Sequence, residues 1–218
     1  MNETQHKILL FVSTGRCATK RIAEILREKL PQDFVVKHQM PISPVANIIG
    51  NVMLRFGASE RIKRLIYQPI VDRYAAQGHF ICTDPLTAMV IPAGVIQSRD
   101  TAVVHLVRER ESFAHSFFRL TRLRPQSWFA HNLIPFWQPG LYPFENSLNK
   151  NILQKYAGIA DLKNEWFFKQ YSINPHYRRI TMDSLFHSAI LEDIIQDFFN
   201  VRITINQSDW AVKANQTQ

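Results

Sequence analysis

The feature that most constrains the fold lies near the amino terminus, where an apolar run leads through a polar turn into a helical pattern. Residues 8–12 are aliphatic or aromatic and carry no charge, which predicts a strand buried on both faces. Residues 13–19 form the turn, and apolar side chains from Ile22 to Leu30 then recur at helical spacing until Pro31. Strand, turn and helix in this order begin a βαβ unit.

The rest of the chain repeats this alternation. Further strands are expected over 34–38, 80–83, 101–107 and 178–182, with helical patterns over 45–77 (broken near Gly57), after Arg108, over 150–170 and through 190–198. Residues 125–149 hold four prolines and little periodicity, which predicts a long loop. The pattern therefore predicts one α/β domain over 1–218, three-layer α/β/α with a mainly parallel central sheet and a helical insertion at about 45–77.

Composition narrows the class of protein. Hydrophobic residues make up 46% of the 218 residues, which excludes wholesale disorder. The net charge of +8 favours anionic partners. Two cysteines exclude a four-cysteine zinc module and a disulfide scaffold, which favours a reducing compartment. No uninterrupted apolar stretch approaches the ~18 residues of a membrane span, so we expect a soluble, cytoplasmic protein.

The first candidate site is the turn between the first strand and its helix. A helix N-terminus presents free N–H groups that bind phosphate, and this turn adds Arg16, Lys20 and Arg21. The alternative is a structural turn whose cations are simply solvated. The turn is not a Walker A loop, because alignment on Lys20 puts Thr14 and Thr19 at the glycine positions and Arg21 at the magnesium-binding hydroxyl. An ATP-dependent kinase is disfavoured on this ground.

The second candidate site follows the strand over 101–107. Arg108 lies at its carboxyl end, the edge at which open α/β sheets bind ligands, and Ser116 follows eight residues later in the next helix. The two meet only if the helix turns back across the strand end. Considered alone, a generic strand end is the better interpretation of this segment.

Together and in this order, the two sites resemble the sulfotransferases that use 3′-phosphoadenosine 5′-phosphosulfate (PAPS). The family's first motif reads basic, Ser, Gly, Thr, Thr, and the matching run here is Arg16-Cys17-Ala18-Thr19-Lys20. The second motif runs from a strand into an arginine with a serine eight positions on, and the run from His105 through Arg108 to Ser116 is similar to it. A weaker third likeness covers residues 180–185.

The resemblance implies a P-loop-type sulfotransferase architecture and a role for each matching residue. PAPS is the implied co-substrate, 3′-phosphoadenosine 5′-phosphate (PAP) the product, and no metal is required. Arg16, helped by Lys20, is expected to stabilise the leaving group, and Arg108 with Ser116 to hold the 3′-phosphate. The nucleotide-binding set is Gly15, Arg16, Cys17, Ala18, Thr19, Lys20, Arg21, Arg108 and Ser116.

The general base is expected at a strand end. His38 ends the second strand, where many relatives place a base, although a structural histidine there is at least as common. Asp84 after the third strand is the second candidate, with a turn before Pro85 as its other interpretation. His105, inside a buried strand, is expected to be structural.

Two departures from the family motif weaken the assignment. Cys17 replaces a serine and Ala18 replaces a glycine, so one hydroxyl contact and some backbone freedom are lost. Alanine still permits close approach of a phosphate if its φ is negative.

The acceptor is less visible in the sequence. We expect a small molecule or glycan that receives the sulfuryl group on a hydroxyl or amine, no nucleic acid and no membrane span. Arg119, Arg122 and Arg124 could guide an acidic acceptor, but a solvated basic face explains them as well. The basic, apolar segment 52–74 fits a packed helix pair better than a membrane-surface helix. Other possible functions are a P-loop kinase or phosphotransferase, a nucleic-acid-binding module and a catalytically silent anion-binding relative.

Overall fold

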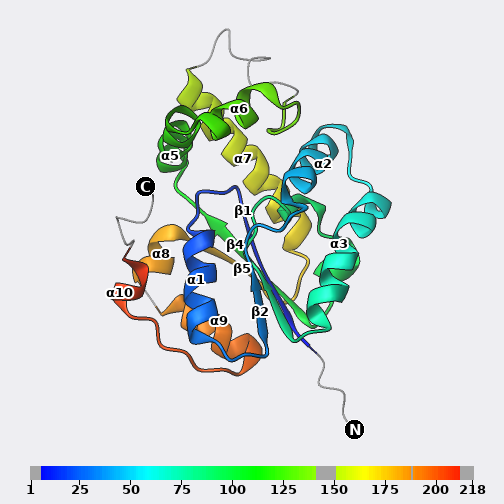
Figure 1. The fold of residues 1–218 in the computed structure, drawn as a ribbon, viewed down its shortest axis with the longest axis vertical. Coiled ribbons are helices and arrows are strands. Elements are labelled where there is room, and N and C mark those ends of the chain that lie inside the picture. The colour runs from blue at the N-terminus through cyan, green and yellow to red at the C-terminus, as the bar shows by residue number, and fades with distance from the viewer. Residues whose placement is uncertain (1–5, 141–150, 188, 212–218) are drawn as a thin grey trace.

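The fold is built on a five-stranded parallel sheet, shown by a computed structural model that describes residues 6–140, 151–187 and 189–211 (Figure 1). The strands are β1 (Ile8–Ser13), β2 (Phe34–Lys37), β3 (His79–Cys82), β4 (Thr101–Val107) and β5 (Tyr177–Thr181). Their order is β2-β3-β1-β4-β5, and each neighbouring pair is parallel. The predicted α/β class and parallel sheet are confirmed.

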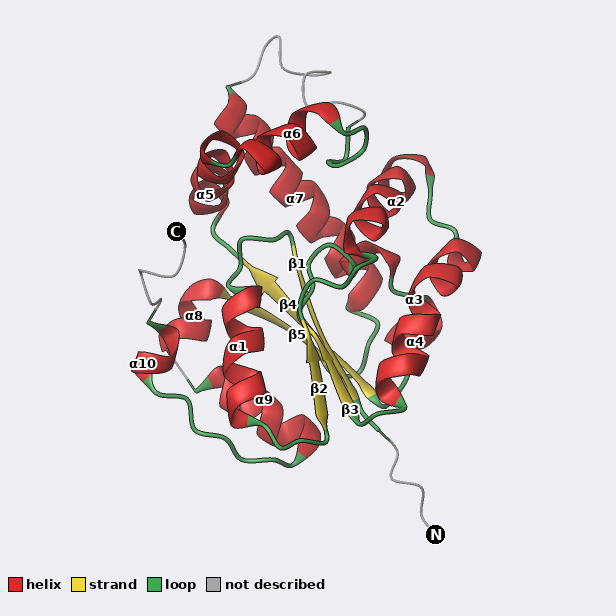
Figure 2. Ribbon diagram, in the orientation of Figure 1, coloured by secondary structure: helices red, strands yellow, loops and turns green. Residues whose placement is uncertain are grey.

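Helices connect the strands and cover the sheet (Figure 2). They are α1 (Thr19–Lys29), α2 (Ser43–Phe56), α3 (Glu60–Ala75), a 3-10 turn η1 (Ala88–Val90), α4 (Ala93–Ile96), α5 (Arg110–Leu123), α6 (Pro125–Leu133), α7 (Ile152–Tyr171), α8 (Met182–His187), α9 (Ile190–Phe199) and α10 (Gln207–Trp210). Among the described residues, no helix is both long enough and apolar enough to cross a bilayer.

Alternation along β1 divides the core into two layers. Leu10 and Val12 face one way and pack with residues of α2, α3 and α7. Leu9 and Phe11 face the other way and pack with residues of α1 and α9. Successive side chains of a strand point to opposite faces, so the continuous apolar run of β1 fills both layers at once. A smaller apolar cluster joins α5 to α7.

One expectation about an element is wrong. Residues 125–133 of the expected loop form α6, which begins at Pro125. Proline suits the first helical position because its missing N–H has no intrahelical partner there. Residues 134–140 are irregular, and 141–149 lie outside the described residues.

Candidate active site

The loop between β1 and α1 has an unusual backbone. Gly15 has φ +87°, Arg16 +58° and Ala18 +54°. The condition of a negative φ at Ala18 is therefore not met: this residue is the N-cap of α1 and lies in the left-handed region, where a Cβ costs about 1–2 kcal/mol. Left-handed residues in a turn direct successive N–H groups into a concavity that suits an anion.

Cys17 turns inward rather than toward that concavity. Its side chain is fully buried among the apolar residues of the α1 layer, and its Sγ lies 3.2 Å from the carbonyl oxygen of Gly15. Burial raises the pKa of the thiol to about 11, so it stays protonated at neutral pH. A cysteine suits this position because the side chain packs in the core.

The first turn of α1 is open to an anion. In the described part of the chain, Ala18 makes no side-chain cap, and no acidic residue lies in the first turn. The N–H groups at such a helix start lack intrahelical acceptors and carry a partial positive charge. Thr19, the first helical residue, is almost fully buried beneath them.

The two predicted motifs meet at this loop. The Nη1 of Arg108 donates to the carbonyl oxygen of Arg16 at 2.9 Å. The Nε of Arg16 donates to the Oγ of Ser116 at 3.0 Å, across 100 residues of sequence. Arg108 and Ser116 therefore both contact the opening turn, through hydrogen bonds with Arg16.

Ser112 also belongs to this junction, and the sequence analysis did not identify it. Its Oγ accepts a hydrogen bond of 3.0 Å from the Nε of Arg108. Ser112 and Ser116 are four residues apart on α5, so they share one helix face. That spacing is the sequence signal that could have found it.

Positive charge gathers around the loop. The pKa of Arg16 is held below its ordinary value by desolvation, and then by the neighbouring guanidinium groups of Arg108 and Arg124. Three guanidinium groups this close repel one another and favour an anion among them. Arg124, at the start of α6, thus adds to the electrostatics of the site.

The other two cations of the turn have partners on α1. Lys20 lies 3.8 Å from Glu24 in an exposed pair, which leaves its ammonium free to turn. Arg21 pairs with Glu24 at 3.0 Å, and its Nε donates to the backbone oxygen of Asp209 at 2.5 Å. The guanidinium of Arg21 is thus held on the C-terminal segment around α10.

His38 follows β2 at the same edge of the sheet. Its Nδ1 lies 3.1 Å from the carbonyl oxygen of Thr83, so this nitrogen carries the proton and Nε2 is left as the basic atom. Desolvation by burial lowers the pKa of His38, which keeps the ring neutral at pH 7. Strand β3 separates β2 from β1, so the strand that carries His38 lies about 10 Å from the strand that precedes the opening turn.

Asp84 has a structural environment. The carboxylate is buried and accepts from the N–H of Met40 at 3.2 Å and the N–H of Leu86 at 2.9 Å. It also accepts from the hydroxyl of Ser43. These bonds tie the end of β3 to the start of α2, and they engage both carboxylate oxygens.

His105 is buried within β4, as expected of a structural residue. Its Nδ1 lies 2.9 Å from the hydroxyl of Tyr177, and its Nε2 lies 3.1 Å from the Oδ1 of Asn164. Desolvation lowers the pKa of His105 to about 4. The ring therefore ties β4 to β5 and α7.

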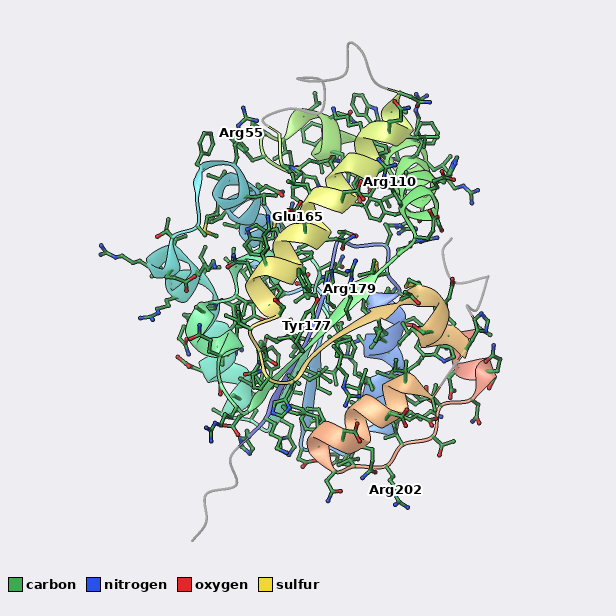
Figure 3. All side chains as sticks on the ribbon, turned by 180° about the vertical axis from the view of Figure 1, so that it is seen from behind. Arg55, Arg110, Glu165, Tyr177, Arg179 and Arg202 are labelled. Atoms are coloured by element: carbon green, nitrogen blue, oxygen red, sulfur yellow. The ribbon has the colours of Figure 1, made fainter. Side chains whose placement is uncertain are left out.

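A hollow of about 480 Å³ lies beside the junction. It is lined by Arg108 and Glu109 after β4, by Arg179 on β5, and by α7. Figure 3 shows Glu165 on α7 and Arg179 on β5 at this side of the molecule. Arg110 and Asp161, also in its wall, form an ion pair of 2.8 Å. The hollow shares Arg108 with the junction, so the candidate site opens toward β5.

Comparisons with known proteins agree with this architecture. No protein-family model matches the sequence, and no curated protein matches it. Among solved structures, the fold is similar to a sulfotransferase domain from the curacin biosynthetic pathway, with a TM-score of 0.51 and 14% identity, over 91% of this chain and 75% of that chain. At this identity the likeness concerns the fold alone, and the chain has a sulfotransferase-like fold.

Proposed function

We propose that this protein is a PAPS-dependent sulfotransferase that moves a sulfuryl group to a hydroxyl or amine of an acceptor, with a carbohydrate as one candidate. The observation that carries the proposal is the junction of Arg16 with Arg108 and Ser116, two motifs a hundred residues apart. The sulfotransferase-like fold supports it.

The residues present fit the proposed nucleotide. The turn after β1 offers a left-handed backbone and an open helix start for a 5′-phosphate, with Thr19 at the first helical position. Arg108 and Ser116 would select a 3′-phosphate, which ATP lacks. On binding, Arg108 and Ser116 would replace their present hydrogen bonds with Arg16 by hydrogen bonds with the 3′-phosphate.

The reaction needs little covalent chemistry from the protein. When bound, PAPS supplies the sulfuryl group. The acceptor oxygen forms a bond to sulfur as the bond from sulfur to the leaving phosphate oxygen breaks, and the acceptor proton must leave. Arg16 and Lys20 would stabilise the charge on the leaving oxygen, and Nε2 of His38 would take the proton.

A catalytically silent anion-binding relative is the second candidate, and the opening turn gives the reason. Cys17 packs into the core where the motif has a hydroxyl, and Ala18 holds a left-handed conformation where the motif has glycine. Such a protein would bind the nucleotide without turnover.

Calorimetry with adenosine 3′,5′-bisphosphate and with ATP, each with and without magnesium, tests the nucleotide site. We expect metal-independent binding of the bisphosphate and much weaker binding of ATP. Magnesium-dependent binding of ATP alone would instead identify a kinase. Transfer of radiolabelled sulfate from PAPS to a panel of acceptors then separates an enzyme from a silent relative.

A further inference from the structure

Large apolar side chains are exposed on α2, α3, α5 and α6. Phe56 at the end of α2 is 70% exposed, Leu65 on α3 is 78% exposed and Leu123 at the end of α5 is 76% exposed. Helix α6 adds three more exposed large apolar side chains: Trp128, Phe129 and Leu133. We call residues 55–65 and 119–137 the apical surface. Large apolar side chains are usually buried, and their exposure in this number indicates an interaction surface.

The same surface is strongly basic. It carries six exposed arginines: Arg55, Arg61, Arg64, Arg119, Arg122 and Arg124. Its acidic residue is Glu60, which accepts from Lys63 at 2.7 Å and from the N–H of Ala93 at 2.9 Å. The sequence from 112 to 144 contains no Asp or Glu. The apical surface therefore carries six exposed arginines against one carboxylate, which is paired with Lys63.

The two halves of the apical surface are joined. The rings of Phe56 and Phe136 meet edge to face with centroids 6.0 Å apart. The side chain of Asn51 on α2 donates to the carbonyl oxygens of Phe136 and Trp137, both at 3.0 Å. Figure 1 shows α2 and α6 at the same end of the molecule. These contacts join the end of α2 to the segment that follows α6.

We propose that the apical surface docks on an anionic lipid bilayer. Arginines attract the negative headgroups, while Trp, Phe and Leu side chains enter the boundary between headgroups and acyl chains. The apolar residues are distributed among arginines over α2, α3, α5 and α6, an arrangement that suits a fluid surface without a complementary shape. This inference is independent of whether PAPS is the donor.

Co-sedimentation with vesicles tests the docking. The full-length protein should bind phosphatidylcholine vesicles that contain phosphatidylserine and leave pure phosphatidylcholine vesicles unbound. The pair Arg61→Gln/Arg64→Gln should lower the partition coefficient by at least about tenfold, since each surface arginine contributes roughly fivefold. The pair Phe56→Ser/Leu65→Ser should lower it at least as much at raised salt, where the apolar contribution dominates.

Matched controls come from outside the apical surface. Arg73→Gln/Arg202→Gln removes the same charge from exposed positions, and Figure 3 places Arg202 at the end of the molecule opposite Arg55. Leu162→Ser/Ile173→Ser removes apolar groups that are 45% and 56% exposed. These variants should bind as the native protein does.

Several results would overturn the docking. They are failure to bind either kind of vesicle, equal binding to both kinds, or equal losses in the control pairs. Gel filtration of the same samples tests whether the apical surface instead joins two copies of the protein. A dimer that Phe56→Ser/Leu65→Ser dissociates, together with no vesicle binding, would identify the surface as an interface between two copies.

Discussion

Ala18 shows at the scale of one residue what a sequence cannot reveal. An alanine after a glycine and two other residues gives no sign of a left-handed conformation, because local preference argues against it. The turn imposes that conformation through its two ends, the strand β1 and the helix α1. The hydrogen bond between Arg16 and Ser116 is likewise not predictable from the sequence, since it depends on the direction that α5 takes after β4.

Replacement of Ala18 by glycine should stabilise the protein. Glycine removes the Cβ penalty at φ +54°, and the gain, less the entropy that glycine adds to the unfolded chain, is up to about 1 kcal/mol. The urea midpoint should rise with an unchanged m-value. Ala23→Gly, within α1, is the control and should destabilise. A lower midpoint for Ala18→Gly would contradict the strained turn.

His38 sets the pH dependence that we expect of turnover. Burial lowers the pKa of His38 below 6.5, so Nε2 is free to accept a proton at neutral pH and becomes protonated only in acid. The value of kcat/KM should therefore be flat near pH 7 and fall only in acid solution, below the ordinary histidine pKa of 6.5. His38→Ala should cut turnover about a hundredfold or more and leave calorimetric binding of the bisphosphate intact. Unaltered turnover would remove His38 as the base.

Lys163 is a half-buried lysine on α7, where the buried Ala160 and Phe167 share its face. Desolvation lowers the pKa of this amine to about 8. The folded state thus binds fewer protons than the unfolded chain between pH 8 and 10.5, and the charged amine destabilises the fold most below pH 8. Lys163→Met should raise the free energy of unfolding at pH 7 by roughly 1–3 kcal/mol.

The coupling between folding and proton binding by Lys163 also predicts how the effect of Lys163→Met depends on pH. The gain from Lys163→Met, measured by urea unfolding, should shrink as the pH rises from 8 toward 10.5, where the unfolded chain also loses the proton. Lys169→Met, which removes an exposed lysine paired with Glu165, should show little change. A gain that does not vary with pH would show that the amine is not desolvated.

At the scale of elements, the apolar pattern predicts most of the architecture. Strand β4 matches its expected bounds, and the continuous apolar runs of β1 and β4 correctly indicate a parallel sheet. Helix α6 escaped prediction because its apolar residues lack periodicity: none is buried, so no core face orders them. Pro125 is a signal for the start of a helix, but the other prolines of residues 125–149 favour a loop.

Gly78, which precedes β3, allows two chain segments to approach each other closely because it has no Cβ. Its φ is +155°, and a Cβ there would lie 2.0 Å from the carbonyl oxygen of Asp33, which accepts from the N–H of His79. Gly78→Ala should lower the free energy of unfolding by about 2 kcal/mol or more, measured with urea. Gly94→Ala, with open space around its Cβ, should have little effect. Equal effects would contradict the close approach.

At the scale of the whole molecule, the sheet order explains why the candidate site forms where it does. Strand β1 lies between β3 and β4, so the turn after it adjoins Arg108 on one side and the end of β3 on the other. The order of motifs along the chain is visible in the sequence, whereas the strand order that brings them together comes from packing on both faces of the sheet.

The central claim is that the two motifs hold opposite ends of one doubly phosphorylated adenosine. Its most direct test is calorimetry that compares adenosine 3′,5′-bisphosphate with adenosine 5′-phosphate, in the native protein, in Arg108→Ala and in the control Arg202→Ala, which removes an exposed arginine outside the candidate site. We predict at least about tenfold tighter binding of the bisphosphate by the native protein and the control, and loss of that preference in Arg108→Ala. Equal affinity of the native protein for the two nucleotides would contradict the account.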